Sequence, residues 1–199
     1  FNGFKRMTES ISRRDFLKGF GMVAAGSCMA AVGAYEYTSR VEAESLVVER
    51  VQTPLKNLSP NLEGFKIVQL SDIHLHPYTQ IDFVQEAVTL ANSLQPDVTV
   101  LTGDYVLQKA DSIFDLAPAL TALNAKYGVF TVLGNHDFWT NVDVVRTGFE
   151  EAGLPILHNA GVALNVAREL IYLAGLDDGW SGKPDLKAAL ANLPATTPT

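Results

Sequence analysis

Three short motifs in the middle of this 199-residue chain carry side chains that can bind metal ions. They are Asp72-Ile73-His74, Gly103-Asp104 and Gly134-Asn135-His136-Asp137. If they met in one crevice, two carboxylates, an amide oxygen and two imidazoles would be costly to bury, because desolvated carboxylates repel each other. Bound cations would remove that cost. This mixture of hard oxygen and borderline nitrogen donors suits Mn, Fe or Zn, and a carboxylate between other ligands can bridge two ions.

Each motif closes a short apolar run, and these runs predict the elements that position the motifs. Residues 65–70, 98–101 and 129–133 are bounded by polar residues or glycine, as expected for strands buried on both faces. Residues 81–94 lie between the first two runs and have one apolar helical stripe, formed by Ile81, Val84, Val88 and Ala91. An order of strand, helix, strand favours parallel strands, whose carboxyl ends share the edge where open α/β sheets bind ligands. The motifs are therefore expected to converge.

In order and spacing, the motifs resemble those of the calcineurin-like metallophosphoesterases, which read Asp-x-His, then Gly-Asp, then Gly-Asn-His-Asp/Glu. Asp72 and Asp104 are 32 residues apart, and Asp104 and Asn135 are 31 apart. The resemblance covers about residues 63–193. It implies an α/β fold, namely the first half of a four-layer α/β/β/α sandwich. The alternative is a Rossmann-like domain whose strands merely have polar ends.

The resemblance also implies a reaction and a role for each motif residue. The expected function is metal-dependent hydrolysis of phosphodiester, phosphomonoester or pyrophosphate bonds by water activated at two divalent metal ions (Mn, Fe or Zn). Asp72 and His74 would hold one ion, Asp104 would bridge, and Asn135 would hold the second. The catalytic residues would be His136 and Asp137. His136 would protonate the leaving oxygen or stabilise the charge of the transition state, and Asp137 would orient His136.

The chain also departs from the family pattern. Protein phosphatases of the family continue with Asp-Arg-Gly where residues 107–109 read Leu-Gln-Lys, so phosphoprotein substrates are disfavoured. The later Gly-His and Gly-His-x-His segments are missing, since the four histidines are His74, His76, His136 and His158. We therefore expect a C-terminally truncated domain. The alternative functions are a catalytically silent metal-binding fragment and a purely structural envelope protein.

Several residues near the motifs have two interpretations. His76 and His158 either reach the site or belong to a loop and a strand end. Asp177 and Asp178 either contribute to function or cap a turn and a helix. The apolar residues beside the motifs suit either a lipid-bearing substrate or a packed core; they are Leu75, Tyr78, Phe138 and Trp139.

The N-terminal region has the pattern of a twin-arginine export signal. Arg13-Arg14 is followed by Phe16-Leu17-Lys18 and by a weakly hydrophobic run over residues 19–35. This predicts export by the twin-arginine machinery to the periplasm or the outer face of the cytoplasmic membrane. The run is marginal in length for a membrane span, yet it could remain as a membrane attachment. The alternative is the basic start of a soluble helix.

The domain plan follows from these patterns. Residues 1–36 are upstream residues and the signal or anchor, residues 37–62 are a linker with an edge strand, and residues 63–199 are the metallophosphoesterase domain.

Residues 1–18 carry a net charge of +3 and the rest −10, so no basic groove for nucleic acid is expected. The expected partner is a small phosphorylated substrate, derived from an envelope lipid or a nucleotide. Cys28 is the only cysteine, which leaves no disulfide.

Turn and helix signals place the remaining elements. We expect helices over residues 118–126, 143–152 and 184–193. Short strands are expected over residues 156–158, 162–166 and 170–174.

Overall fold

The computed structural model describes residues 26–27, 29–31 and 45–194, and the chain divides into two units, of which the first ends at Arg50 and the second begins at Val51. The twin-arginine motif and most of the apolar run that follows it lie outside these residues. No helix in the described part of the chain is long and apolar enough to cross a membrane.

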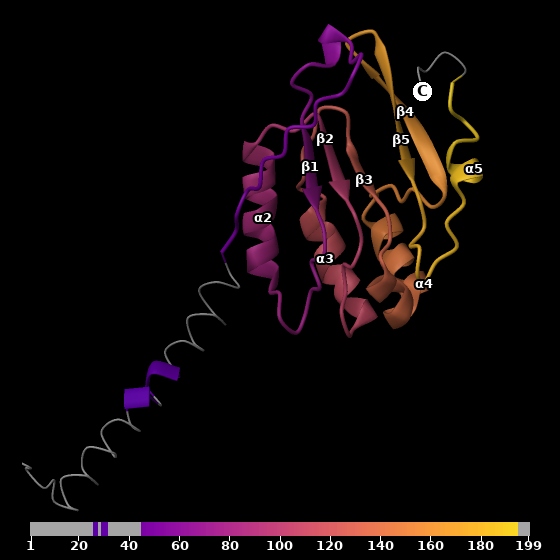
Figure 1. The fold of residues 1–199 in the computed structure, drawn as a ribbon. Coiled ribbons are helices and arrows are strands. Elements are labelled where there is room, and N and C mark those ends of the chain that lie inside the picture. The colour runs from indigo at the N-terminus through magenta and orange to yellow at the C-terminus, as the bar shows by residue number, and fades with distance from the viewer. Residues whose placement is uncertain (1–25, 28, 32–44, 195–199) are drawn as a thin grey trace, which may run out of the picture. The chain divides into compact units, whose positions relative to one another are not determined.

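The second unit is built on a three-stranded parallel sheet in the order β1-β2-β3 (Figure 1). The strands are β1 (Ile67–Leu70), β2 (Val98–Leu101) and β3 (Val129–Thr131). β2 pairs with both neighbours in parallel register and is buried along most of its length. The predicted strands and their parallel order are confirmed. Ile156 adds a single parallel bridge beside Thr131, where a further strand was expected.

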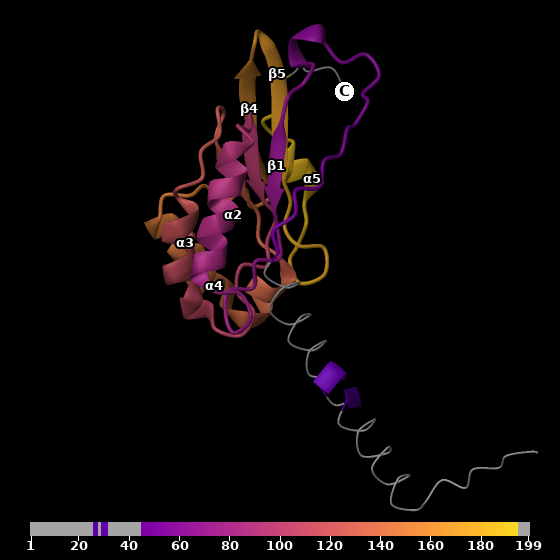
Figure 2. The same ribbon diagram turned by 90° about the vertical axis from the view of Figure 1, so that its left-hand side faces the viewer.

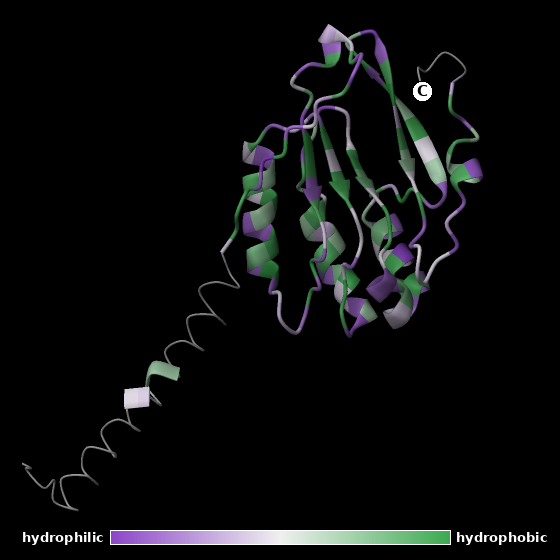
Figure 3. Ribbon diagram, in the orientation of Figure 1, coloured by the Kyte–Doolittle hydropathy of each residue, from purple (hydrophilic) through white to green (hydrophobic). Residues whose placement is uncertain are grey.

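Three helices cover one face of this sheet (Figure 2). They are α2 (Ile81–Ser93), α3 (Ile113–Leu120) and α4 (Asn135–Glu151), and the 3-10 turn η3 (Ala110–Ser112) leads into α3. α2 buries the predicted stripe, and Figure 3 shows its alternating hydrophobic and hydrophilic residues. The helices and the sheet thus share one hydrophobic core, with the polar faces of the helices outward.

A β-hairpin covers the other face of the sheet. It consists of β4 (Ala160–Val166) and β5 (Glu169–Gly175), paired antiparallel. Leu164 and Val166 of the hairpin pack with Val98 of β2 in a second hydrophobic cluster. The short α5 (Leu186–Ala189) lies outside the hairpin, where the Tyr172 hydroxyl donates to the Ala189 carbonyl at 2.9 Å. The layers are therefore helix, sheet, sheet, helix, in agreement with the predicted α/β architecture.

Three helix predictions were wrong in their limits. The helix expected over residues 184–193 covers only Leu186–Ala189. The helix expected from Pro118 begins earlier, at Ile113, because Ile113, Leu116 and Leu120 together bury its inner face. Pro118 lies inside this helix rather than at its start, so it has no N–H to bond the carbonyl four residues earlier, and the burial of the inner face has to offset that lost bond. α4 begins at Asn135 and is interrupted at Asn141, whose side chain accepts a bond from Val144 N at 3.3 Å. The predicted helix of residues 143–152 corresponds to its second part.

The linker region differs from the prediction as well. Within the described residues 45–62 there is no strand, and only the 3-10 turn η2 (Pro60–Leu62) is regular. Val47 and Val51 are exposed, so the alternation that suggested an edge strand does not bury a face.

Candidate metal centre

The three motifs meet at the carboxyl edge of the parallel sheet. The segment after β1 continues beside the segment after β2 through backbone hydrogen bonds: Asp72 N donates to Gly103 O at 3.1 Å, and His74 N donates to Asp104 O at 2.9 Å. The segment after β3 enters α4, where His136 N donates to the Asp104 carboxylate at 2.9 Å. The predicted convergence is thus realised by the backbone itself.

Three side chains form the cluster, namely His74, Asp104 and His136. Among the described residues, their ligand atoms lie within 4.8 Å of one another and could hold a metal ion. His74 Nε2 is 3.8 Å from both an Asp104 and an Asp72 carboxylate oxygen, which is too far for a direct hydrogen bond. Its Nδ1 is buried and has no partner in the described part of the chain. An imidazole left unsatisfied beside two carboxylates fits a site that a divalent cation completes.

The backbone of the cluster is strained. Asp72, His74 and Asp104 have φ angles of 54°, 48° and 58°, in the left-handed region that side-chain-bearing residues seldom adopt. Each such residue typically costs about 1–3 kcal/mol and persists only where its surroundings impose it. This conformation turns the ends of β1 and β2 toward the cluster, so the strain accompanies the convergence of the ligands.

Two glycines allow the loops to approach closely. Gly103 has a φ of 96°, and a Cβ there would collide with the backbone of Gly134. A Cβ on Gly134 would lie 2.6 Å from Asp104 N and would strike the Asp104 carboxylate. The second and third motifs therefore both require glycine beside their ligands for steric reasons.

Asp137 lies beneath the cluster, and its side chain is fully buried. Its carboxylate accepts four hydrogen bonds from backbone N–H groups, those of Gly134 (2.9 Å), Asp104 (3.0 Å), Tyr105 (2.9 Å) and Val106 (3.3 Å). Burial raises the pKa of Asp137 to about 6, and the bonds from Gly134, Tyr105 and Val106 oppose that rise. These bonds tie the second motif to the third.

Sequence reasoning missed Tyr105. Its buried hydroxyl is 2.9 Å from two carbonyl oxygens and can donate to either. One belongs to Leu101, the last residue of β2, and the other to Val132, which follows β3. Burial raises the pKa of this phenol well above its usual value. Its position directly after Gly103-Asp104 was the only available signal, because its partners become neighbours only in the folded sheet.

The other predicted residues occupy distinct positions. Asp72 belongs to the edge of the cluster, with 67% of its side chain exposed, and Ser71 Oγ donates to it at 2.6 Å. Asn135 is the first residue of α4, between Gly134 and His136. His76 closes a turn through a bond from its N–H to Thr79 O at 3.0 Å.

His158 pairs with Asp177 rather than with the three-residue cluster. The distance between His158 Nδ1 and Asp177 Oδ1 is 3.0 Å. Asp178 accepts bonds from the N–H groups of Trp180 and Ser181, as expected for a turn cap.

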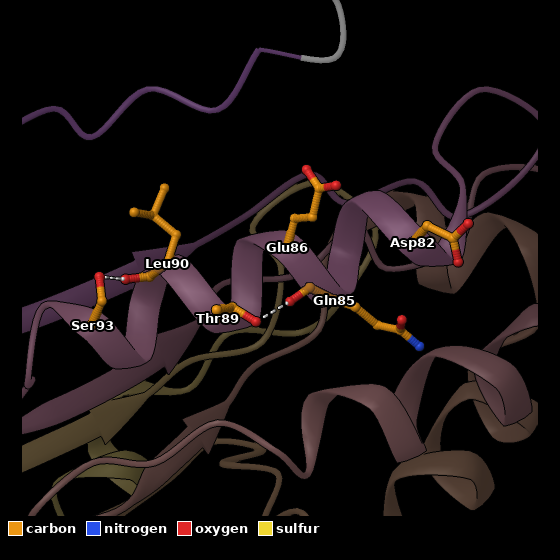
Figure 4. Close-up of a pocket in the computed structure, with 6 residues that line it drawn as sticks. All are labelled: Asp82, Gln85, Glu86, Thr89, Leu90 and Ser93. Carbon is orange, nitrogen blue, oxygen red and sulfur yellow. Dashed lines mark hydrogen bonds between the residues drawn. The ribbon is translucent and has the colours of Figure 1, made fainter.

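A pocket elsewhere on the surface has no comparable chemistry. It lies along α2 and is lined by Asp82, Gln85, Glu86, Thr89, Leu90 and Ser93 (Figure 4). The Thr89 and Ser93 hydroxyls already donate to backbone carbonyls of the same helix. Because all its lining comes from one helix, groups from different elements do not converge there as they do at the cluster.

Comparison with known proteins identifies the family. Residues 65–186 match the model of the calcineurin-like phosphoesterases. The chain is 34% identical over 193 residues to an uncharacterized metallophosphoesterase, YkuE, of Bacillus subtilis, covering 93% of this chain and 66% of that protein. The chain therefore belongs to the calcineurin-like phosphoesterase family.

Two further relatives have more specific names. The phosphodiesterase YaeI of Escherichia coli is 28% identical over 190 residues, covering 92% of this chain and 67% of that protein. The UDP-2,3-diacylglucosamine pyrophosphatase LpxG of Chlamydia muridarum is 36% identical over 107 residues, covering 53% of this chain and 32% of that protein. The chain thus spans about two thirds or less of these curated relatives. No solved structure matches it significantly.

Proposed function

We propose that this protein is a metal-dependent phosphoesterase that hydrolyses phosphodiester or pyrophosphate bonds. The observation that carries the proposal is the cluster of His74, Asp104 and His136 at the ends of three different elements. Family membership supports the reaction class. Two divalent ions would supply Lewis-acid activation of water and would neutralise charge on the phosphoryl group.

The residues of the site would divide the work as follows. Asp72 and His74 would hold one ion, Asp104 would bridge, and Asn135 would hold the second. Asp104 suits the bridging role because its two carboxylate oxygens face different motifs, Oδ2 toward His74 and Oδ1 toward His136 N. The exposed side of Asp72 leaves room for a substrate phosphate.

His136 is proposed to donate a proton to the leaving oxygen. Its ring packs edge-on against the His74 ring, with centroids 4.7 Å apart and an interplanar angle of 80°. That arrangement places an imidazole beside the ligands, within reach of an ester oxygen held there. A ring in the same position could instead serve as a further metal ligand, so the two roles need an experiment.

Replacing His136 by Ala separates these roles. If His136 is the general acid, we expect kcat for a phosphodiester with an alcohol leaving group to fall by about 10²–10⁴-fold while metal content after dialysis stays unchanged, with a much smaller fall for bis-p-nitrophenyl phosphate, whose leaving group needs little protonation. Loss of metal together with activity would assign His136 as a ligand. Activity equal to that of the wild type would contradict both roles. His76→Ala, a change in the turn after the first motif, is the matched control.

A second candidate is a metal-binding chain without turnover. It is motivated by the small donor set, since three His and Asp residues of the described part share the cluster. Metal content and activity distinguish the two candidates. Bound metal without hydrolysis would favour the metal-binding chain without turnover, whereas two ions per chain together with turnover would exclude it.

The substrate is proposed to be a small phosphorylated compound derived from an envelope lipid or a nucleotide. The names of the Escherichia coli and Chlamydia muridarum relatives, a phosphodiesterase and a UDP-sugar pyrophosphatase, support this class. The acidic charge of the chain beyond residue 18 disfavours a nucleic-acid substrate.

We also propose export by the twin-arginine route, which carries folded cargo. A metal site assembled from three separate segments forms only during folding, so export after folding lets the cytoplasm determine which metal enters. Changing Arg13 and Arg14 to Lys is expected to abolish delivery, and the protein should accumulate in the cytoplasm with metal bound. Fractionation followed by immunoblotting measures this. Undiminished delivery to the periplasm would refute the route.

A further inference from the structure

Two tryptophans meet directly beside the candidate metal centre. The Trp139 ring contacts the His136 ring, with centroids 4.8 Å apart and an interplanar angle of 61°. The Trp180 ring contacts Trp139 in turn, at 5.0 Å and 81°. Both indoles are largely exposed, 54% for Trp139 and 78% for Trp180. A line of aromatic rings therefore leads outward from the cluster to the surface.

The position of Trp180 is built by its loop. The Asp178 carboxylate accepts the N–H groups of Trp180 (2.9 Å) and Ser181 (2.6 Å), and Gly182 N donates to the Asp178 carbonyl at 3.0 Å. A turn held by three bonds presents the exposed indole in one place. This explains the polar residues before Trp180 without a direct chemical role.

The loop is also fixed to the β-hairpin layer. The buried Asp177 carboxylate accepts a hydrogen bond from the Lys183 N–H at 3.1 Å. The backbone N–H of Asp177 donates to the Asn159 side-chain oxygen at 3.2 Å. Asn159 also donates to Lys183 O at 2.8 Å and accepts from Asp185 N at 2.9 Å. A loop anchored by the buried Asp177 and by the half-buried Asn159 costs little to order on binding, which favours a ligand contact at its tip.

We propose that Trp139 and Trp180 form a subsite for a flat ring carried by the substrate, of which a nucleobase is the biological example. The proposal rests on the phosphoesterase function, because the ring is delivered by a phosphate held at the cluster. Two indoles at 81° offer a face for stacking and an edge-to-face contact at once. Trp180 is one ring farther from His136 than Trp139 is, which leaves space for the sugar that separates a base from its phosphate.

The test uses the fact that the chain has two tryptophans and both lie in the proposed subsite. Uridine 5′-monophosphate, ribose 5-phosphate and octyl phosphate are titrated into the metal-loaded protein by calorimetry. Intrinsic fluorescence is followed in parallel. We expect the uridine nucleotide to quench the fluorescence and to bind about tenfold more tightly than ribose 5-phosphate, as one stacked base requires. Octyl phosphate binding as tightly as the nucleotide would overturn the preference for a flat ring.

Variants locate the effect. Trp180→Ala is expected to bring the Kd of ribose 5-phosphate close to that of uridine 5′-monophosphate, so that their ratio approaches one. Trp180→Phe is expected to retain most of the tenfold preference because a ring remains. Phe114→Ala removes an exposed aromatic ring from α3 and should leave the ratio unchanged. A tenfold ratio that survives Trp180→Ala would overturn the proposal.

Two outcomes separate this proposal from the function on which it rests. Hydrolysis with equal binding of nucleotide and ribose phosphate would refute the subsite and leave the reaction intact. Ring-selective binding that depends on Trp180, without metal-dependent hydrolysis, would support the subsite and refute the reaction.

Discussion

Replacing Asp104 by Asn is expected to lower the hydrolysis of bis-p-nitrophenyl phosphate by about 10²–10³-fold, the scale of removing one preorganised stabilising group from an active site. Asn keeps the shape of the side chain and can still accept the bond from His136 N. It loses the negative charge that would bridge two cations. The expected loss is therefore one of metal binding and charge stabilisation rather than of folding.

Three measurements on the Asp104 variant distinguish these effects. Metal content after dialysis should fall from two ions per chain, kcat should drop, and the midpoint of urea unfolding of the metal-free protein should change little. Asp111→Asn is the matched control, because Asp111 is an exposed carboxylate in the η3 turn. An Asp104→Asn protein that hydrolyses the diester as fast as the wild type would exclude the bridging role.

The convergence of the three motifs was predictable because it depends on local pattern and topology. Residues 98–101 are apolar and β-branched, and a helical stripe precedes them, so parallel strands follow from short-range signals. Once the strands are parallel, their carboxyl ends must share one edge. The positions of His74 and Asp104 beside each other were therefore accessible from the sequence.

Other features depend on tertiary contacts that a local pattern does not encode. Pro118 suggested a helix start, yet the helix begins at Ile113 because apolar side chains before the proline pack into the core. The contact of Trp139 with Trp180 joins a helix to a loop beyond the hairpin. Likewise, the four bonds to Asp137 come from two motifs that are adjacent only after folding.

The geometry of Asp137 points to positioning rather than to direct proton transfer. Each of its carboxylate oxygens accepts two backbone N–H groups: Oδ2 those of Asp104 and Gly134, and Oδ1 those of Tyr105 and Val106. These groups belong to the two loops that contain the proposed ligands. The carboxylate thus holds the loops in register and keeps their N–H groups satisfied where water is excluded.

Asp137→Ala is accordingly expected to lower the free energy of unfolding by about 3 kcal/mol or more, since each buried N–H left unpaired costs about 1–3 kcal/mol. Asp137→Asn retains one acceptor oxygen but turns an NH₂ toward two N–H donors, so it should also destabilise the protein, by less than Ala. Urea unfolding of the metal-free protein measures both, with Asp143→Ala, an exposed carboxylate on α4, as the control. If Asp137→Ala unfolded at the wild-type urea concentration but had lost its activity, Asp137 would belong to the chemistry instead. With the expected loss of stability, weaker metal binding should follow, because the loops that carry Asp104 and His136 would no longer be held together.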